Sequence, residues 1–117
     1  MKAQIIEIGP KAIGDNEAIL IFFNETATEL LKEYTIIQRF VDDNWEELVI
    51  GDKISFGEQV YTITHLGKNV LDQLRDLGHV SFFFGEAPKE ELINAITLKE
   101  EKLPEISQGM NITYKAG

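Results

Sequence analysis

Two histidines, His65 and His79, are the strongest candidates for nucleophilic chemistry in this chain, which has no cysteine. An imidazole with its ordinary pKa of about 6.5 keeps an unprotonated nitrogen at neutral pH, and that nitrogen can accept a phosphoryl group. His79 directly follows Gly78 and precedes an apolar stretch. It is therefore expected at a corner between a helix and a strand, where backbone N–H groups can meet an anion. We take His79 as the candidate catalytic residue.

Simpler interpretations stand beside this one. His79 could cap the end of the helix or hydrogen-bond a backbone carbonyl without any chemical role. His65 falls at the end of a predicted strand and is expected at the surface, as a second choice for a direct role.

The segment 51–85 must position both histidines. Period-2 alternation predicts strands over Lys53–Phe56 and Val60–His65, joined by a tight turn at Gly57. Apolar residues at helical spacing then predict a short helix that begins after Asn69 and ends at Gly78. A further strand is expected over Val80–Phe84, with Phe83 pointing away from its two aromatic neighbours.

The rest of the chain is rich in short strands. They are predicted over Ala3–Ile8, Ala18–Phe23 (buried on both faces), Thr35–Val41, Ile93–Leu98 and Met110–Tyr114. A turn is expected over residues 14–17, and a short helix within Asn24–Tyr34, capped by Asn24 or Thr26. The sequence thus predicts one mainly β domain over residues 1–117: a small closed or partly open antiparallel β-barrel with one or two short helices.

Charge and composition exclude several functions. Eleven basic and twenty acidic residues give a net charge of −9, without the Lys/Arg clusters that binding to nucleic acid requires. This counts against a barrel that binds oligosaccharides or nucleic acid. We expect no direct membrane insertion and a cytoplasmic location, because there is neither a signal-peptide pattern nor a membrane-spanning run. Gly67-Lys68 is not a P-loop, and the two histidines lack zinc-site spacing, so no cofactor and no metal are expected.

The run LGKNVLDQLRDLGHVSFFFG resembles a segment of the glucitol/sorbitol-specific IIA component of the bacterial sugar phosphotransferase system. Matching positions are Gly67, Leu74, Leu77, Gly78, His79, Ser81 and Phe84. IGDKISFG and KLPEISQGMNITY resemble two further segments of that family, so the likeness covers nearly the whole chain. The resemblance implies a phosphohistidine relay that takes a phosphoryl group from the carrier HPr and passes it to a IIB domain of a IIB/IIC permease.

One departure from the family affects the site. In the family, the phosphorylated histidine lies four residues after the tyrosine of a Glu-Tyr pair. Here Glu33-Tyr34 matches this pair, and Gln38 occupies the position of the phosphorylated histidine. A carboxamide nitrogen is not basic and cannot carry a phosphoryl group in this way. Either another histidine acts, His79 before His65, or the protein is a non-phosphorylatable binding or regulatory module. Gln38 itself would most simply be a polar strand residue facing water.

Overall fold

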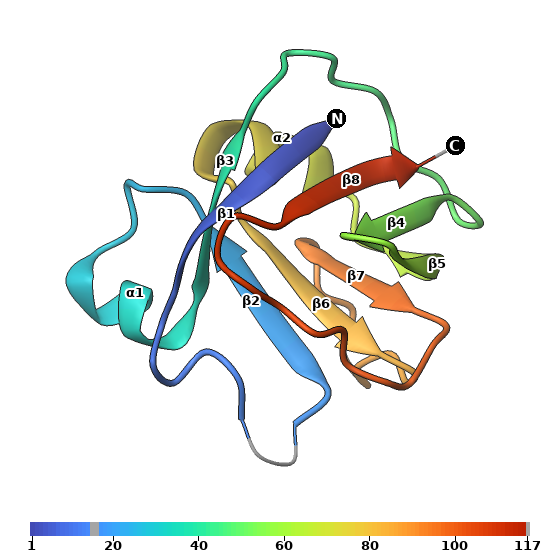
Figure 1. The fold of residues 1–117 in the computed structure, drawn as a ribbon. Helices are drawn as coiled ribbons and strands as arrows, with labels where there is room; N and C mark the ends of the chain where they lie inside the picture. Colours follow the sequence, from blue (N-terminus) through green and yellow to red (C-terminus); the bar gives the residue numbers. More distant parts are fainter. Residues whose placement is uncertain (15–16, 117) are drawn as a thin grey trace.

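The computed structural model describes residues 1–14 and 17–116, which form eight strands and two short helices. The strands are β1 (Lys2–Ile8), β2 (Ile19–Phe23), β3 (Ile36–Phe40), β4 (Lys53–Phe56), β5 (Gln59–Leu66), β6 (Val80–Phe84), β7 (Ala95–Leu98) and β8 (Asn111–Ala116). Helix α1 (Glu29–Tyr34) lies between β2 and β3 in the chain, and helix α2 (Val70–Leu77) lies between β5 and β6 (Figure 1). Residues 15 and 16, at the centre of the predicted turn, lie outside the described residues.

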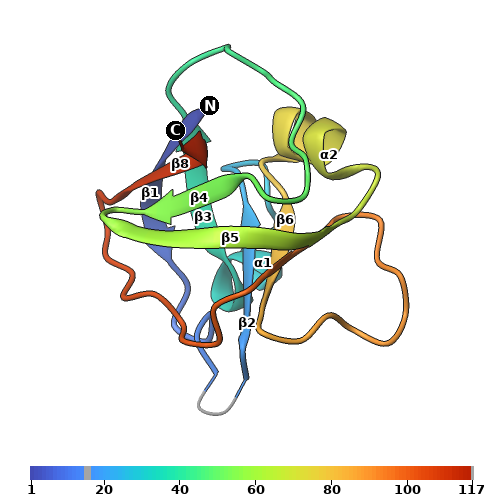
Figure 2. The ribbon, with the colours of Figure 1, turned by 90° about the vertical axis from the view of Figure 1, so that its right-hand side faces the viewer.

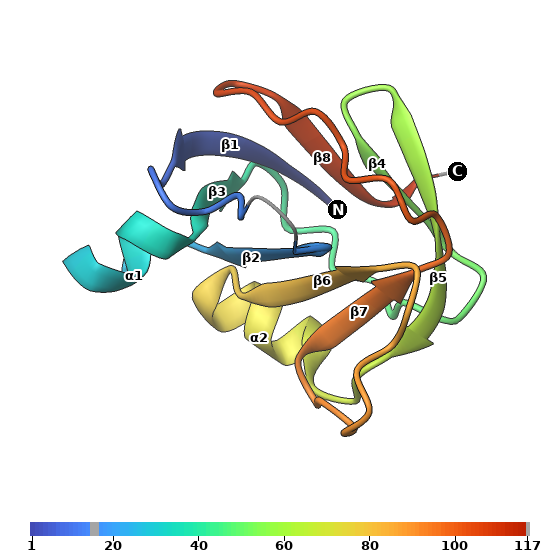
Figure 3. The ribbon, with the colours of Figure 1, turned by 90° about the horizontal axis from the view of Figure 1, so that it is seen from below.

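The strands close into a barrel in the order β1–β3–β2–β6–β7–β5–β4–β8, and β8 pairs back onto β1. The predicted barrel is therefore confirmed. Most neighbouring strands are antiparallel, but β2 pairs in parallel with β3, and β6 with β7. A parallel pair needs a crossover connection, which the segment holding α1 and the segment 85–94 supply. Seen from below, both helices lie outside the barrel wall, with α2 beside β6 (Figure 3).

Aromatic side chains fill the barrel interior. The ring of Phe82 meets those of Phe22 and Phe56 edge to face, with centroids 5.5 and 5.2 Å apart. All three side chains are fully buried. Along β6, Phe82 and Phe84 point inward and Phe83 lies half-buried on the outer face, as the alternation predicts. The barrel interior is thus a packed and mainly apolar core.

Helix α2 packs on the barrel through Val70 and Leu74, its two buried residues. Gly78 ends the helix in the left-handed conformation, with φ of 59°, as predicted. The backbone N–H groups of Gly78 and His79 donate to the carbonyl oxygens of Leu74 and Gln73, at 2.9 and 3.1 Å. The helix end is therefore closed by its own backbone.

The end of β2 packs directly against this turn. The backbone N–H of Asn24 donates to the carbonyl oxygen of Leu77 at 2.8 Å. A Cβ atom added to Gly78 would lie only 2.7 Å from the Cβ of Asn24, so a side chain at this position would force the two segments apart. The close approach fixes His79 beside the last residues of β2.

Three local expectations are corrected by the structure. Helix α1 begins later than predicted, so its N-cap is Thr28, whose Oγ1 accepts the N–H of Leu31 at 3.2 Å. Asn69 does precede α2, but its side chain makes no capping hydrogen bond. Strand β2 is not buried on both faces, because only Leu20 and Phe22 point into the core.

Within residues 1–14 and 17–116, neither helix is long and apolar enough to cross a membrane.

The packing predicts a sharp difference between neighbouring phenylalanines on β6. Phe82→Ala removes a fully buried ring at the centre of the aromatic core, and we expect it to lower the free energy of unfolding by about 3–5 kcal/mol. Phe83→Ala, on the outer face, is the matched control and should cost about 1 kcal/mol. Urea denaturation measures both values. Equal losses in the two variants would contradict this description of the core.

Candidate functional site

His79 lies at the corner between α2 and β6, with both ring nitrogens in hydrogen bonds. Nδ1 is 3.0 Å from the carbonyl oxygen of Phe22, and Nε2 is 2.6 Å from Nδ2 of Asn94. The ring stacks on Phe23 with centroids 4.1 Å apart and an interplanar angle of 16°. Only 9% of the residue is exposed. The imidazole is thus held from three sides on the outer part of the barrel wall.

These contacts define the protonation state of the ring. A carbonyl oxygen only accepts, so Nδ1 of His79 must carry a proton. Burial lowers the pKa of His79 below its ordinary value of 6.5, and the hydrogen bond to Phe22 opposes this only in part. The ring is therefore neutral at pH 7, and the lone pair of Nε2 accepts an N–H of Asn94. The hydrogen bond to a backbone carbonyl that the sequence suggested is therefore present at Nδ1. Nε2 has the lone pair that a nucleophile needs.

The corner itself does not supply backbone donors to an anion. The N–H groups of Gly78 and His79 are both used in closing helix α2. The expectation that free N–H groups meet an anion here is therefore wrong for this conformation. An anion at this corner would therefore have to find its hydrogen-bond donors among the neighbouring side chains.

Gln38 does not face water, contrary to the sequence-based expectation. It is fully buried inside the barrel, where its Nε2 donates to the carbonyl oxygen of Gly78 at 2.9 Å. Its Oε1 accepts the hydroxyl of Tyr114 at 2.8 Å. Burial raises the pKa of Tyr114, so the phenol keeps the proton that it donates. The carboxamide is thus satisfied by two neutral partners within the core.

Gln38 and His79 come together in space, although they lie far apart in the chain. Gln38 binds the carbonyl of Gly78, and the next residue is His79. The side chain of Gln38 points into the barrel, whereas the ring of His79 packs on Phe23, which lies on the outer face of β2. They therefore occupy opposite sides of one stretch of barrel wall.

His65 lies apart from this pair. It is exposed, and its Nδ1 is 3.1 Å from the hydroxyl of the neighbouring Thr64. A β-bulge between Ile63 and His65 interrupts the pairing of β5 with β7. His65 lines an open cleft of about 380 Å³ together with Lys89. Among the described residues, no group of three His, Cys, Asp or Glu side chains could hold a metal ion.

A second cleft, of about 320 Å³, was not predicted. The loop 41–52 between β3 and β4 passes beside α2 (Figure 2) and brings Trp45 near Leu74 of the helix. The same cleft is lined by Arg39 and Arg75, the only arginines of the chain. We call it the arginine–tryptophan cleft. No spacing in the sequence brings these residues together, because they come from β3, a loop and α2.

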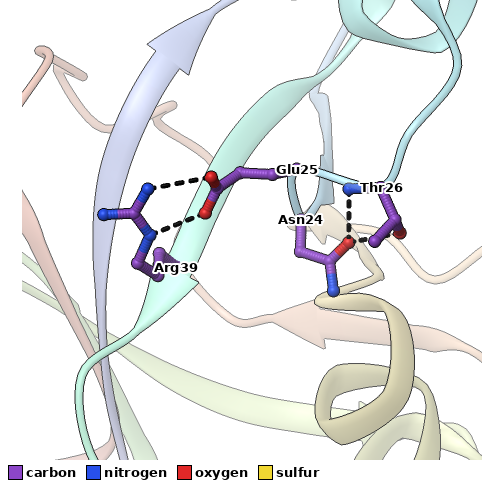
Figure 4. A network of polar contacts seen from close by, with 4 residues as sticks. All are labelled: Asn24, Glu25, Thr26 and Arg39. Carbon is purple, nitrogen blue, oxygen red and sulfur yellow. Dashed lines mark hydrogen bonds and ion pairs between the residues drawn. The ribbon is translucent and has the colours of Figure 1, made fainter.

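Both arginines of this cleft are already paired. Arg39 donates to both carboxylate oxygens of Glu25 at 2.6 and 2.8 Å, next to an Asn24–Thr26 turn (Figure 4). These hydrogen bonds lower the pKa of Glu25. Arg75 donates to Asp72 at 2.8 Å and to a second carboxylate on α2. Each arginine of this cleft therefore has its charge balanced by at least one carboxylate.

The fold and this site define a β-barrel protein with a shielded neutral histidine on its wall. The chain superposes with a TM-score of 0.91 on the crystal structure of a PTS system IIA component from Enterococcus faecalis V583. The two are 36% identical, and the match covers 99% of this chain and 100% of the other. A family model, PTS system glucitol/sorbitol-specific IIA component, matches residues 1–113. No curated protein sequence matches.

The chain therefore belongs to the glucitol/sorbitol-specific IIA family of the sugar phosphotransferase system. This confirms the resemblance found in the sequence. Membership implies a role in sugar phosphotransfer and interaction with HPr and IIB components.

The buried Gln38–Tyr114 contact predicts a loss of stability. Tyr114→Phe leaves Oε1 of Gln38 without a donor inside the core and should lower the free energy of unfolding by about 1–3 kcal/mol. Tyr34→Phe is the control, because that ring is exposed on α1. Denaturant unfolding with an unchanged m-value is the measurement. A cost below that of the control would contradict the assigned network.

The shielded state of His79 predicts a pH dependence. The pKa of His79 in the folded protein lies below 6.5, so as the pH falls the unfolded chain takes up this proton first. The contribution of His79 to stability is then complete above about pH 6.5 and is lost as the pH falls toward its folded pKa. The stability difference between the wild type and His79→Gln should therefore shrink between about pH 7.5 and 5 in urea denaturation. A difference that grows on acidification would show the opposite shift.

Proposed function

We propose that this protein is a cytoplasmic phosphocarrier that accepts a phosphoryl group from HPr on Nε2 of His79 and passes it to a IIB domain. The observation that supports this most is the hydrogen bond from Nδ1 of His79 to the carbonyl of Phe22. It leaves the lone pair on Nε2, the nitrogen farther from the backbone, in a ring that is neutral at pH 7.

The transfer is an exchange of one P–N bond for another. The Nε2 lone pair attacks phosphorus, and the bond to the imidazole of HPr breaks with its electron pair staying on that leaving nitrogen. Nδ1 keeps its proton, and the carbonyl oxygen of Phe22 stabilises the positive charge that develops on the ring. In transfer to IIB, a nucleophile of that domain attacks phosphorus, and the bond to Nε2 of His79 breaks with its electron pair returning to Nε2.

Weak contacts with two successive partners are compatible with the surface near the site. Leu77, two residues before His79, exposes 39% of its surface, and Phe23 is half-buried beside the ring. Gly78, the residue before His79, also lines the arginine–tryptophan cleft. Aromatic and arginine side chains are common at protein interfaces, and small contacts of this kind dissociate quickly.

A second candidate function is favoured by Gln38. The family position for phosphorylation holds a carboxamide that is fully buried and engaged with Tyr114 and Gly78. A protein that keeps the fold and its docking surface but carries no phosphate would act as a binding or regulatory module for the same partners.

Phosphoryl transfer can be measured directly. The protein is incubated with phosphoenolpyruvate, Enzyme I and HPr, and acid-labile phosphate on the chain is quantified. We expect labelling of the wild type and of His65→Gln, the matched control for an exposed histidine, and its loss in His79→Gln. Labelling that survives in His79→Gln would overturn the assignment.

The same assay separates the two functions. If the wild type is not phosphorylated and Gln38→His is, the protein is better described as a binding or regulatory module. In that case the wild type should still bind HPr or IIB, and a pull-down with either protein tests this.

A further inference from the structure

The side chain of Asn94 covers the nitrogen that the proposed transfer requires. Its Nδ2 lies 2.6 Å from Nε2 of His79, and it is the polar partner of that nitrogen. An amide nitrogen only donates, so the contact occupies the lone pair that would attack phosphorus. Asn94 is partly exposed, whereas His79 behind it is buried. The contact thus joins a buried imidazole to a side chain that reaches solvent.

The backbone around Asn94 is held in place. Its carbonyl oxygen accepts the N–H of Ser81 at 3.1 Å, and the carbonyl of the preceding Ile93 accepts the N–H of Asn69 at 2.8 Å. On the other side, the carbonyl of Ala95 accepts the N–H of Gly67 at 2.8 Å. Because the peptides on both sides are fixed to β6 and to the connection between β5 and α2, the freedom that remains to Asn94 is rotation of its side chain.

We propose that Asn94 is the gate and positioning residue of His79: closed, it holds the lone pair of Nε2 and keeps the ring in the Nδ1–H form; rotated, it opens Nε2 to an electrophile. This inference rests on the proposed function, and it adds a way to regulate the access of a phosphoryl donor to His79. Once rotated, the same amide N–H can donate to an oxygen of the arriving phosphoryl group. Asn94 itself forms and breaks no covalent bond.

Acylation by diethylpyrocarbonate tests the gate without any partner protein. An unprotonated imidazole nitrogen attacks the reagent and gains an ethoxycarbonyl group, while carbon dioxide and ethanol leave, the ethanol taking the Nδ1 proton. The exposed His65 serves as a reference within the same molecule, and mass spectrometry of peptides reads both histidines. In the wild type, His79 should react more slowly than His65.

Asn94→Ala should raise the acylation rate of His79 about three- to tenfold, which corresponds to the loss of one hydrogen bond and its cover. The rate of His65 should not change. Asn111→Ala, which removes the same amide from an exposed position on β8, is the matched control and should change neither rate. If Asn94→Ala folds poorly, Asn94→Ser supplies a second variant with a side chain too short to reach Nε2.

Two results would overturn the gate: equal His79 rates in the wild type and Asn94→Ala, or a wild-type His79 that reacts as fast as His65. A second readout is the tautomer, read from the ¹⁵N shifts of the ring. Asn94→Asp should move His79 from the neutral Nδ1–H form toward the ring protonated on both nitrogens, because a carboxylate accepts a hydrogen bond from Nε2–H and favours the positive charge. If phosphoryl labelling fails while these effects are seen, the proposed function is wrong and the gate remains. If labelling succeeds without them, only the gate is wrong.

Discussion

The left-handed turn at Gly78 positions the other residues of the site. Its N–H closes helix α2, its carbonyl accepts the side chain of Gln38, and its missing Cβ lets the end of β2 approach at Asn24. One residue therefore joins α2, β2 and β3 before the chain enters β6. The position of His79 follows from this junction, because the ring reaches the carbonyl of Phe22 only when β2 and α2 meet this closely.

The junction also separates two polar environments. On the inner side, Gln38 and Tyr114 form a neutral pair that satisfies the buried polar groups of a packed core. A phosphoryl group carries negative charge, and burying it there would cost far more than burying a carboxamide. On the outer side, His79 is covered by a partly exposed side chain and is close to solvent. The chemistry that the proposed function needs is therefore less costly on the outer side of the wall in this chain.

The sequence predicts the residues on the outer side of this barrel wall better than those on its inner side. Helix α2, its glycine end and the place of His79 follow from signals within about ten residues, so they are readable locally. Gln38 follows two isoleucines, and the strand lacks the alternation that would reveal which face it occupies. Its partner Tyr114 is 76 residues away, and no local pattern joins them. Asn94 sits in a polar connection before β7, where an asparagine is ordinary, so its contact with His79 is visible only in three dimensions.

A phosphoryl carrier has to keep a reactive bond away from water and still present it to two proteins. The barrel interior meets only the first need, because aromatic rings fill it. A fully exposed histidine such as His65 meets only the second. His79 stands between these extremes: Phe23 covers one face of the ring, the Phe22 carbonyl fixes its far edge, and a single rotatable amide closes the remaining side. In the proposed mechanism the site opens by rotation of one side chain, so no domain has to move.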